Sequence, residues 1–553
     1  MRNLVVHLLL LAPVLLFGQS QAPTFAFVRA GEGASFPYDH EAGDQYPEYA
    51  VVKKIFQDLV EAQGNRQLPR PRLVMQNAGQ YVAWMNPEGP VIGLEIKAYE
   101  VCRSFGADSL NAVAALLAHE LTHYYQEHGW SRQFAAETGG ELGEKVANGE
   151  NSLNYEAQAD HLGGFLAYAA GYPTFGMMPE LLERLYEAYG LDAQLDGYPS
   201  LEERQALAAD AADQVKELVD VYEMSVLLTT LERFEDARVY LHRILRDFQS
   251  RDLYNNLGVM AVLEALPQFH KNELPYGLPI ELDAEGRLKQ GATRFPCQSR
   301  DCRQARIGLL ETAIENFDQA IALDPDYATA FLNKAIAYHL LDLPEDAEYY
   351  ASRALRMVKK QNLLKLTADT WTLLGILAAT QADEQKALDN FGKAQALGSS
   401  LAAENIRILK SEAQPLIALS RSAKGLEMVD SLRPEAFLSN PAIHREIPVN
   451  ESIILGIADK EQSSVFFHFA DNGRSYAFFH LTGENYTGQT TLGIKTGDAE
   501  QKVIKHYQKP YRRLELRSGS VLVYPIHKLL FFLNEAGKVQ QWAVVREKKM
   551  AGK

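Results

Sequence analysis

A repeated spacing of large and small residues, between about residues 313 and 394, limits the fold of this chain more than any other feature of its sequence. The pattern runs through "ENFDQAIALDPDYATAFLNKAIAYHLLDLPEDAEYYASRAL" and returns in the stretch that follows. Its large members are Phe317, Phe331, Tyr338, Trp371 and Phe391, and its small members are Ala320, Ala335, Ala347, Ala354, Gly375, Ala387 and Ala394. Small residues at a fixed period let paired helices cross closely, while large residues fill the space against neighbouring pairs. The spacing therefore predicts a stack of helix pairs.

This pattern resembles the tetratricopeptide (TPR) repeat, which implies an α-solenoid with a groove for protein partners. We expect about four units over residues 218–400. An earlier unit is indicated by Ala237, Leu241 and Ile244, and the next begins near Gly258 but is interrupted by an insertion at 266–305. An ordinary helical bundle is the alternative, and the register of two adjacent units favours TPR.

The first residues have the composition of an export signal. Arg2 provides a positive start, an apolar run follows from Leu4 to Phe17, and "GQSQA" supplies small and polar residues. This order predicts a signal peptide over residues 1–22, with a retained anchor as the alternative. The mature chain is then periplasmic or secreted, with peripheral attachment to the cell envelope as an option and no integral membrane segment. A net charge of -16 argues against nucleic acid as a partner.

The stretch "LLAHELTHYYQEHGW" contains the residues with the clearest chemistry. His119 and His123 are four residues apart on a predicted helix, so they project from one face and can both reach one zinc ion. Glu120 lies beside them, where it can meet a water bound to the metal. The alternative is a surface helix that happens to carry two histidines, so a third ligand is needed.

A candidate third ligand lies in "NYEAQADHLGGFLAYAAGY". Glu156 and Asp160 are also four apart on a predicted helix. Glu156 can offer a carboxylate oxygen to zinc, and Asp160 can accept the remaining N–H of a ligand histidine and orient its ring. The two stretches together predict one zinc ion per chain.

These motifs, with "YVAWMNPEGPVIGLEI" before them, resemble the gluzincin metallopeptidases of the HtpX and CAAX-prenyl-protease type over residues 45–200. Transmembrane helices are usual in that family, whereas TPR repeats make this chain more similar to soluble periplasmic members of the β-barrel assembly-enhancing protease type. The resemblance implies His119, His123 and Glu156 as zinc ligands and Glu120 as general base. It implies a metalloendopeptidase that acts on unfolded or misassembled polypeptides in the quality control of cell-envelope proteins. A TPR chaperone or scaffold with a latent peptidase site is the alternative.

The expected fold is mainly α with α+β parts. We expect a peptidase domain at 23–217 with a small β-sheet, the TPR solenoid at 218–400, a helical connector at 401–435 and a strand-rich α+β domain at 436–553. "GPVIGLEIKAY" is either an edge strand that adds a substrate peptide or an internal strand. Cys297 and Cys302 are close enough in sequence to form a disulfide, which leaves Cys102 buried and free. Four residues near the motif are candidates to donate a hydrogen bond to the oxyanion that forms during the reaction: Tyr124, Tyr125, His128 and His161.

Overall fold

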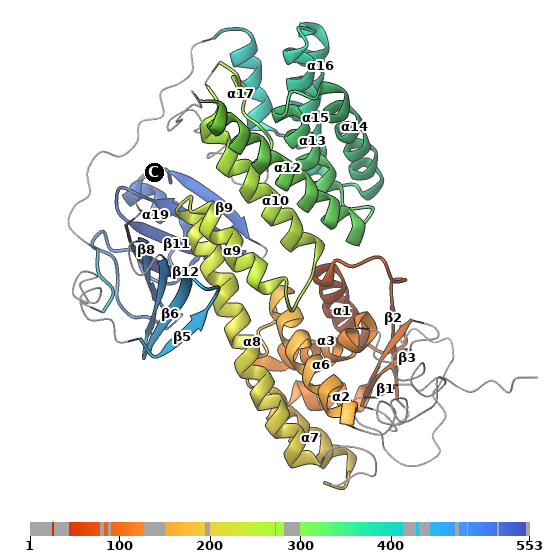
Figure 1. Ribbon diagram of the computed structural model, residues 1–553. Coiled ribbons are helices and arrows are strands. Elements are labelled where there is room, and N and C mark those ends of the chain that lie inside the picture. Colours follow the sequence, from red (N-terminus) through yellow and green to blue (C-terminus); the bar gives the residue numbers. More distant parts are fainter. Residues whose placement is uncertain are drawn as a thin grey trace, which may run out of the picture.

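The computed structural model describes residues 25–26, 44–77, 82–86, 90–126, 150–193, 200–270, 272–280, 299–412, 427–430, 443–470, 475–483, 485–516 and 519–548. The predicted signal peptide, residues 1–22, lies outside these ranges. The described chain is mainly helical and has an N-terminal region of helices around a small sheet, a helical array and a C-terminal antiparallel sheet (Figure 1). Among the described residues, no helix combines the length and hydropathy needed to span a membrane.

The N-terminal region packs helices against a four-stranded sheet. Its strands are β1 (Phe25–Ala26), β2 (Arg72–Gln76), β3 (Ala83–Asn86) and β4 (Val91–Glu95), and its helices are α1 (Tyr49–Gln63), α2 (Ile96–Arg103), α3 (Ser109–Tyr125), α6 (Glu150–Ala169) and α7 (Met178–Tyr189). A single 3₁₀ turn, η1 (Gly106–Asp108), precedes α3. Helix α3 is the central element, because every residue from Ala112 to Tyr124 is buried.

Strand β4 is an internal strand, and this excludes the edge-strand interpretation of "GPVIGLEIKAY". The strand order is β1-β3-β4-β2, so β4 is paired on both sides. It runs parallel to β2 and antiparallel to β3. The backbone groups of β4 are therefore used within the sheet and cannot add a substrate peptide as a new strand.

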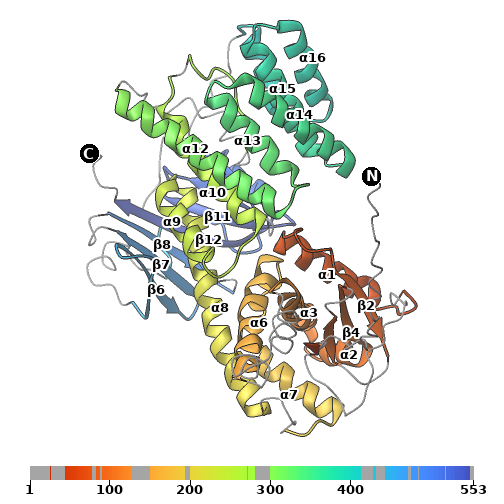
Figure 2. The same cartoon turned by 45° about the vertical axis from the view of Figure 1, so that its right-hand side comes forward.

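Helix α8 (Leu201–Thr230) connects the N-terminal region to the helical array. Its start is well defined by a capping box, in which the Ser200 side chain and the Glu203 side chain satisfy each other's backbone N–H groups. The helix is continuous through residues 217 and 218, where the sequence suggested a domain boundary. The two regions therefore share one element instead of being joined by a linker (Figure 2).

The array continues as pairs of helices. After α8 come α9 (Phe234–Ile244), α10 (Arg251–Ala265), a 3₁₀ turn η2 (Leu266–Gln268), α12 (Arg300–Leu323), α13 (Ala328–Leu340), α14 (Pro344–Gln361), α15 (Leu364–Thr380), α16 (Glu384–Ala396) and α17 (Ser400–Leu409). The small residues of the repeat lie where helices meet. A Cβ atom on Gly375 would lie 2.4 Å from the Phe391 ring, and one on Gly258 would lie equally close to Phe317. The predicted large–small pairing therefore places α15 on α16 and α10 on α12.

The C-terminal region is a single antiparallel sheet of eight strands in the order β5-β6-β7-β8-β12-β11-β10-β9. These are β5 (Arg445–Pro448), β6 (Ile453–Lys460), β7 (Ser463–Ala470), β8 (Ser475–Thr482), β9 (Arg512–Leu516), β10 (Gly519–Tyr524), β11 (Leu529–Asn534) and β12 (Val539–Lys548), with α19 (Glu500–Tyr507) between β8 and β9. Alternate residues face opposite sides, so Val521 and Val523 join the main core while Leu522 and Tyr524 pack near α19. The predicted strand-rich region is confirmed.

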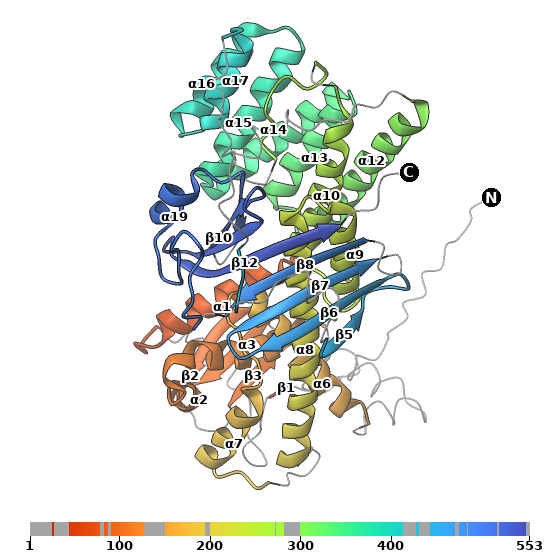
Figure 3. The ribbon, with the colours of Figure 1, turned by 90° about the vertical axis from the view of Figure 1, so that its left-hand side faces the viewer.

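Polar contacts connect both outer regions to the array. At the end of α1, Glu61 accepts from Arg251 at 2.8 Å, and Arg251 also pairs with buried Asp324. On the other side, Tyr240 of α9 hydrogen-bonds His468 of β7 at 3.0 Å. Figure 3 shows the sheet nearly face-on, with α8 and α9 behind it. Helices α8 to α10 are therefore the frame that positions the remaining regions.

Candidate metal centre

The two motif histidines meet inside the protein. His119 and His123 lie one turn apart on α3, and each is 1% exposed. Their Nε2 atoms are 3.1 Å apart. Glu120, between them in sequence, is also fully buried. The motif is thus part of the core, and the surface-helix interpretation is wrong for this fold.

Helix α6 brings two carboxylates to the same place. Glu156 Oε2 lies 3.4 Å from His119 Nε2, and Glu156 Oε1 lies 3.6 Å from His123 Nε2. The approach of α6 to α3 depends on Gly163, where a Cβ atom would lie 3.0 Å from the backbone nitrogen of His119. Any larger residue would push the helices apart, so glycine permits this convergence.

The ligand atoms fit a small tetrahedral cation. Atoms held tetrahedrally at 2.0–2.1 Å from one ion lie about 3.3 Å from each other. The two Nε2 atoms are 3.1 Å apart, and each lies near one oxygen of the Glu156 carboxylate, at 3.4 Å for His119 and 3.6 Å for His123. Two imidazole nitrogens and one carboxylate are a donor set that suits zinc and leaves a fourth position open. Among the described residues, this trio is the one cluster of metal-ligand type.

Asp160 orients the ring of His119. Its Oδ1 lies 2.7 Å from His119 Nδ1. A carboxylate only accepts hydrogen bonds, so Nδ1 carries the proton and Nε2 is the nitrogen that faces His123 and Glu156. This is the arrangement expected from the sequence for a residue supporting a ligand histidine.

Arg204 of α8 completes the cluster and was missed in the sequence. This buried arginine, 2% exposed, lies 3.1 Å from Asp160 Oδ2 and 3.4 Å from Glu156 Oε2. A signal for it exists: Arg204 stands on the same face of α8 as buried Ala208, Ala211 and Val215. A cation on an otherwise apolar helix face requires a buried anion nearby.

The electrostatics of the site favour the ionised form of Glu156. Burial alone would raise the pKa of Glu156, but Arg204 and the two histidines outweigh burial and hold this pKa far below its ordinary range. Burial likewise opposes protonation of His119, but Asp160 and Glu156 raise the pKa of its imidazole to about 10. A cation bound at Nε2 competes with this proton, since metal ligands must be deprotonated.

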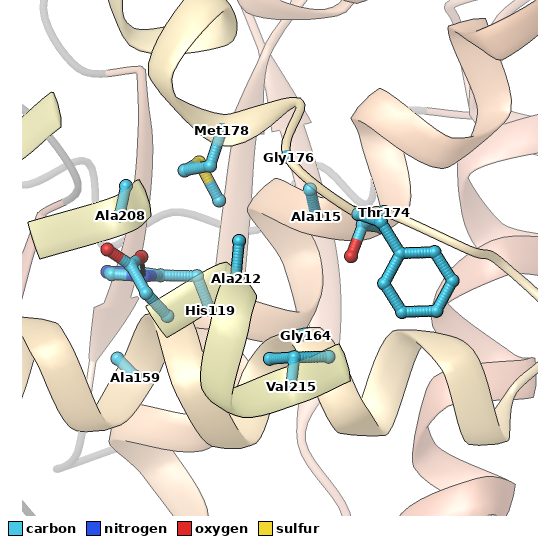
Figure 4. Close-up of a pocket in the computed structure, with 12 residues that line it drawn as sticks. Ala115, His119, Ala159, Gly164, Thr174, Gly176, Met178, Ala208, Ala212 and Val215 are labelled. Carbon is cyan, nitrogen blue, oxygen red and sulfur yellow. Dashed lines mark hydrogen bonds and ion pairs between the residues drawn. The ribbon is translucent and has the colours of Figure 1, made fainter. Parts of the chain in front are cut away.

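A small pocket adjoins His119 and Asp160 (Figure 4). Short side chains from α3, α6 and α8 line much of it, namely Ala115, Ala159, Gly164, Ala208 and Ala212. Short side chains allow these three helices to approach one another. The pocket therefore marks the close helix packing that surrounds the candidate site.

The other residues near the motif have structural contacts. The Tyr124 hydroxyl donates to the Pro69 carbonyl at 2.5 Å. Burial raises the pKa of the Tyr125 hydroxyl. On α6, burial lowers the pKa of His161, which lies near Asp247 and Arg243. His128 lies outside the described residues.

The cysteines belong to other parts of the fold. Cys302 at the start of α12 is disulfide-bonded, and Cys297, its predicted partner, lies outside the described residues. Cys102 on α2 is free and buried, and burial raises the pKa of its thiol. Neither described cysteine takes part in the metal-ligand cluster.

Comparison with known proteins gives matches in the helical array. The family described as TPR repeat matches residues 307–342, from within α12 through α13. Tetratricopeptide repeat protein 36 of Mus musculus is 33% identical over 159 residues, which cover 27% of this chain and 83% of that protein. Both matches agree with the helix pairs and the glycine–phenylalanine contacts of the array. The chain therefore belongs to the tetratricopeptide repeat family.

Proposed function

We propose that this chain is an exported zinc metalloendopeptidase that hydrolyses unfolded or misassembled polypeptides and uses its TPR array to bind protein partners. The observation that supports this most is the convergence of His119, His123 and Glu156, with ligand-atom separations of 3.1 to 3.6 Å. The peptidase part of the proposal uses the resemblance of the two helical motifs to gluzincins. The protein-binding part uses the TPR match.

The residues of the site have separate tasks in this proposal. When bound, zinc supplies a Lewis acid that acidifies a water molecule and polarises a carbonyl group. Glu120 accepts a proton from the water and delivers it to the leaving amine. Asp160 keeps the His119 ring in one orientation through the 2.7 Å contact. Arg204 offsets the charge of two buried carboxylates, which would otherwise oppose folding before metal binds.

The N-terminal stretch is the basis for the proposed cellular location. Residues 1–22 have the order of charge, apolar run and small residues that is typical of export. We propose a periplasmic or secreted location and a role in quality control of envelope proteins. An epitope tag at the C-terminus, followed by cell fractionation, tests the location: recovery with cytoplasmic markers would contradict it.

The catalytic proposal is tested by an unfolded-protein digest with and without a chelator. We expect cleavage by the zinc-loaded parent and none after chelation. Glu120→Gln should retain one zinc per chain and lose cleavage by at least ~100-fold, the lower range for a general base. Glu183→Gln, at an exposed position of α7, is the matched control and should cleave like the parent. Equal cleavage by Glu120→Gln would remove Glu120 as the base.

A TPR scaffold with a latent site is the second candidate. Burial of the motif favours it, because Glu120 is 0% exposed and both histidines are 1% exposed. A latent site would bind zinc and yet leave the substrate intact under all conditions of the digest. The same experiment therefore separates the two candidates.

A further inference from the structure

The first helices of two repeat pairs, α13 and α15, are buried on every side along their central turns. In α13, eight consecutive residues from Ala330 to Ala337 are buried. In α15, the seven residues from Thr372 to Ala378 are buried. Runs of this length extend around the helix for about two turns at 3.6 residues per turn, so no face is open to solvent. Solenoid repeats normally leave one concave surface open for ligands. This surface is therefore covered here.

A segment of the chain's own insertion lies against the array. Residues 272–280, "NELPYGLPI", contain no helix or strand, yet Leu274, Leu278, Pro279 and Ile280 are buried. At the start of the segment, Glu273 pairs with Arg306 of α12, with Oε2 and Nη1 3.6 Å apart. The Tyr276 ring lies 6.3 Å from the Phe391 ring of α16. The segment thus packs across several repeats instead of extending into solvent.

One side chain binds the backbone of this segment. Asn405 of α17 is fully buried, and its Oδ1 accepts from the Gly277 N–H at 2.8 Å. Its Nδ2 donates to the Gly277 carbonyl at 3.0 Å. A side-chain amide that pairs with both the N–H and the C=O of one residue binds the backbone, so this contact does not depend on the side chain at that position.

We propose that residues 272–280 occupy a peptide-binding surface of the array, bounded by α12, α16 and α17, and that an extended apolar client segment displaces them. A tethered segment competes at an effective concentration of millimolar order, so a free client binds weakly until the segment leaves. The inference rests on the proposed function only in taking unfolded polypeptide as the client. Peptide binding can be measured whether or not the chain cleaves peptides.

The experiment measures binding of a fluorescent peptide with the sequence of residues 272–280 by anisotropy. All chains are full length and carry Glu120→Gln, so that the peptide stays intact. Leu278→Asp places a charge at a buried position of the tethered segment and should release it. We expect this variant to bind the peptide at least ~10-fold more tightly than the parent, since the competing segment is removed. Adding Asn405→Ala to Leu278→Asp should weaken binding by at least ~10-fold.

Two controls make the result specific. Leu364→Asp introduces the same charge at a leucine that is 62% exposed, and it should bind the peptide like the parent. Gly277→Pro removes the N–H that donates to Asn405 and adds no charge. It is a second way to release the segment, to be used if circular dichroism shows that Leu278→Asp is unfolded. The proposal is overturned if neither release variant binds more tightly than the parent, or if Asn405→Ala leaves binding unchanged.

Discussion

Replacing Asp160 by asparagine should weaken zinc binding while keeping the shape of the site. The substitution removes one negative charge from a residue that is 7% exposed. Asp160 contacts His119 Nδ1 at 2.7 Å and Arg204 at 3.1 Å. The carboxylate of Asp160 accepts hydrogen bonds from both groups. An asparagine side chain has a single acceptor oxygen and would keep only one of the two contacts. Arg204 then keeps Glu156, at 3.4 Å, as its remaining anion and competes with the metal for that carboxylate.

The size of the effect follows from these contacts. Loss of a partner that supports a ligand histidine typically reduces metal affinity by about 10- to 100-fold. This corresponds to about 1.4–2.8 kcal/mol of binding free energy. The contacts of Asp160 are buried and therefore little screened by salt. We expect a loss toward the upper end of the range, with little dependence on ionic strength.

Competitive titration against a chromophoric zinc chelator at neutral pH measures this loss. Asp210→Asn makes the same chemical change at an exposed position of α8 and should bind zinc like the parent. Circular dichroism reports whether each variant is folded. Zinc affinity of Asp160→Asn within about twofold of the parent would refute the role given to Asp160, because that role requires a loss of at least tenfold.

Two further predictions concern packing and pH. Gly375→Ala should lower the free energy of unfolding by about 1–3 kcal/mol in urea denaturation, because its Cβ would lie 2.4 Å from the Phe391 ring; Gly392→Ala, with nothing within 4 Å, should not destabilise, and equal effects would contradict the close contact. Burial, then Asp220, raise the pKa of Glu223 from 4.5 to about 7, although the Tyr168 hydroxyl lowers it. Between pH 4.5 and about 7, the folded state therefore keeps a proton on Glu223 that the unfolded state has lost, and the free energy of unfolding falls as pH rises through this range. Glu223→Gln should add roughly 1–3 kcal/mol of stability near pH 8 and little near pH 4, and an equal gain at both would contradict this.

Helical spacing made several features readable from the sequence. Residues four apart share a helix face whatever the rest of the fold does, so the pairs His119/His123 and Glu156/Asp160 could each be assigned locally. The TPR register is local in the same way, because small and large residues such as Gly375 and Phe391 stand at fixed positions within a repeat unit. Alternating apolar residues likewise identified the C-terminal strands. Each of these signals depends on neighbours along the chain.

The remaining features depend on contacts between residues that are distant in sequence. That α6 reaches α3 closely enough to join the two pairs depends on packing at Gly163. Arg204 and the internal place of β4 became apparent only when α8 and the strands took their positions. The contact between Gly277 and Asn405 joins an insertion to a helix 128 residues away. Local periodicity states which face of an element is apolar or carries a ligand, whereas the burial of all elements together decides which faces meet.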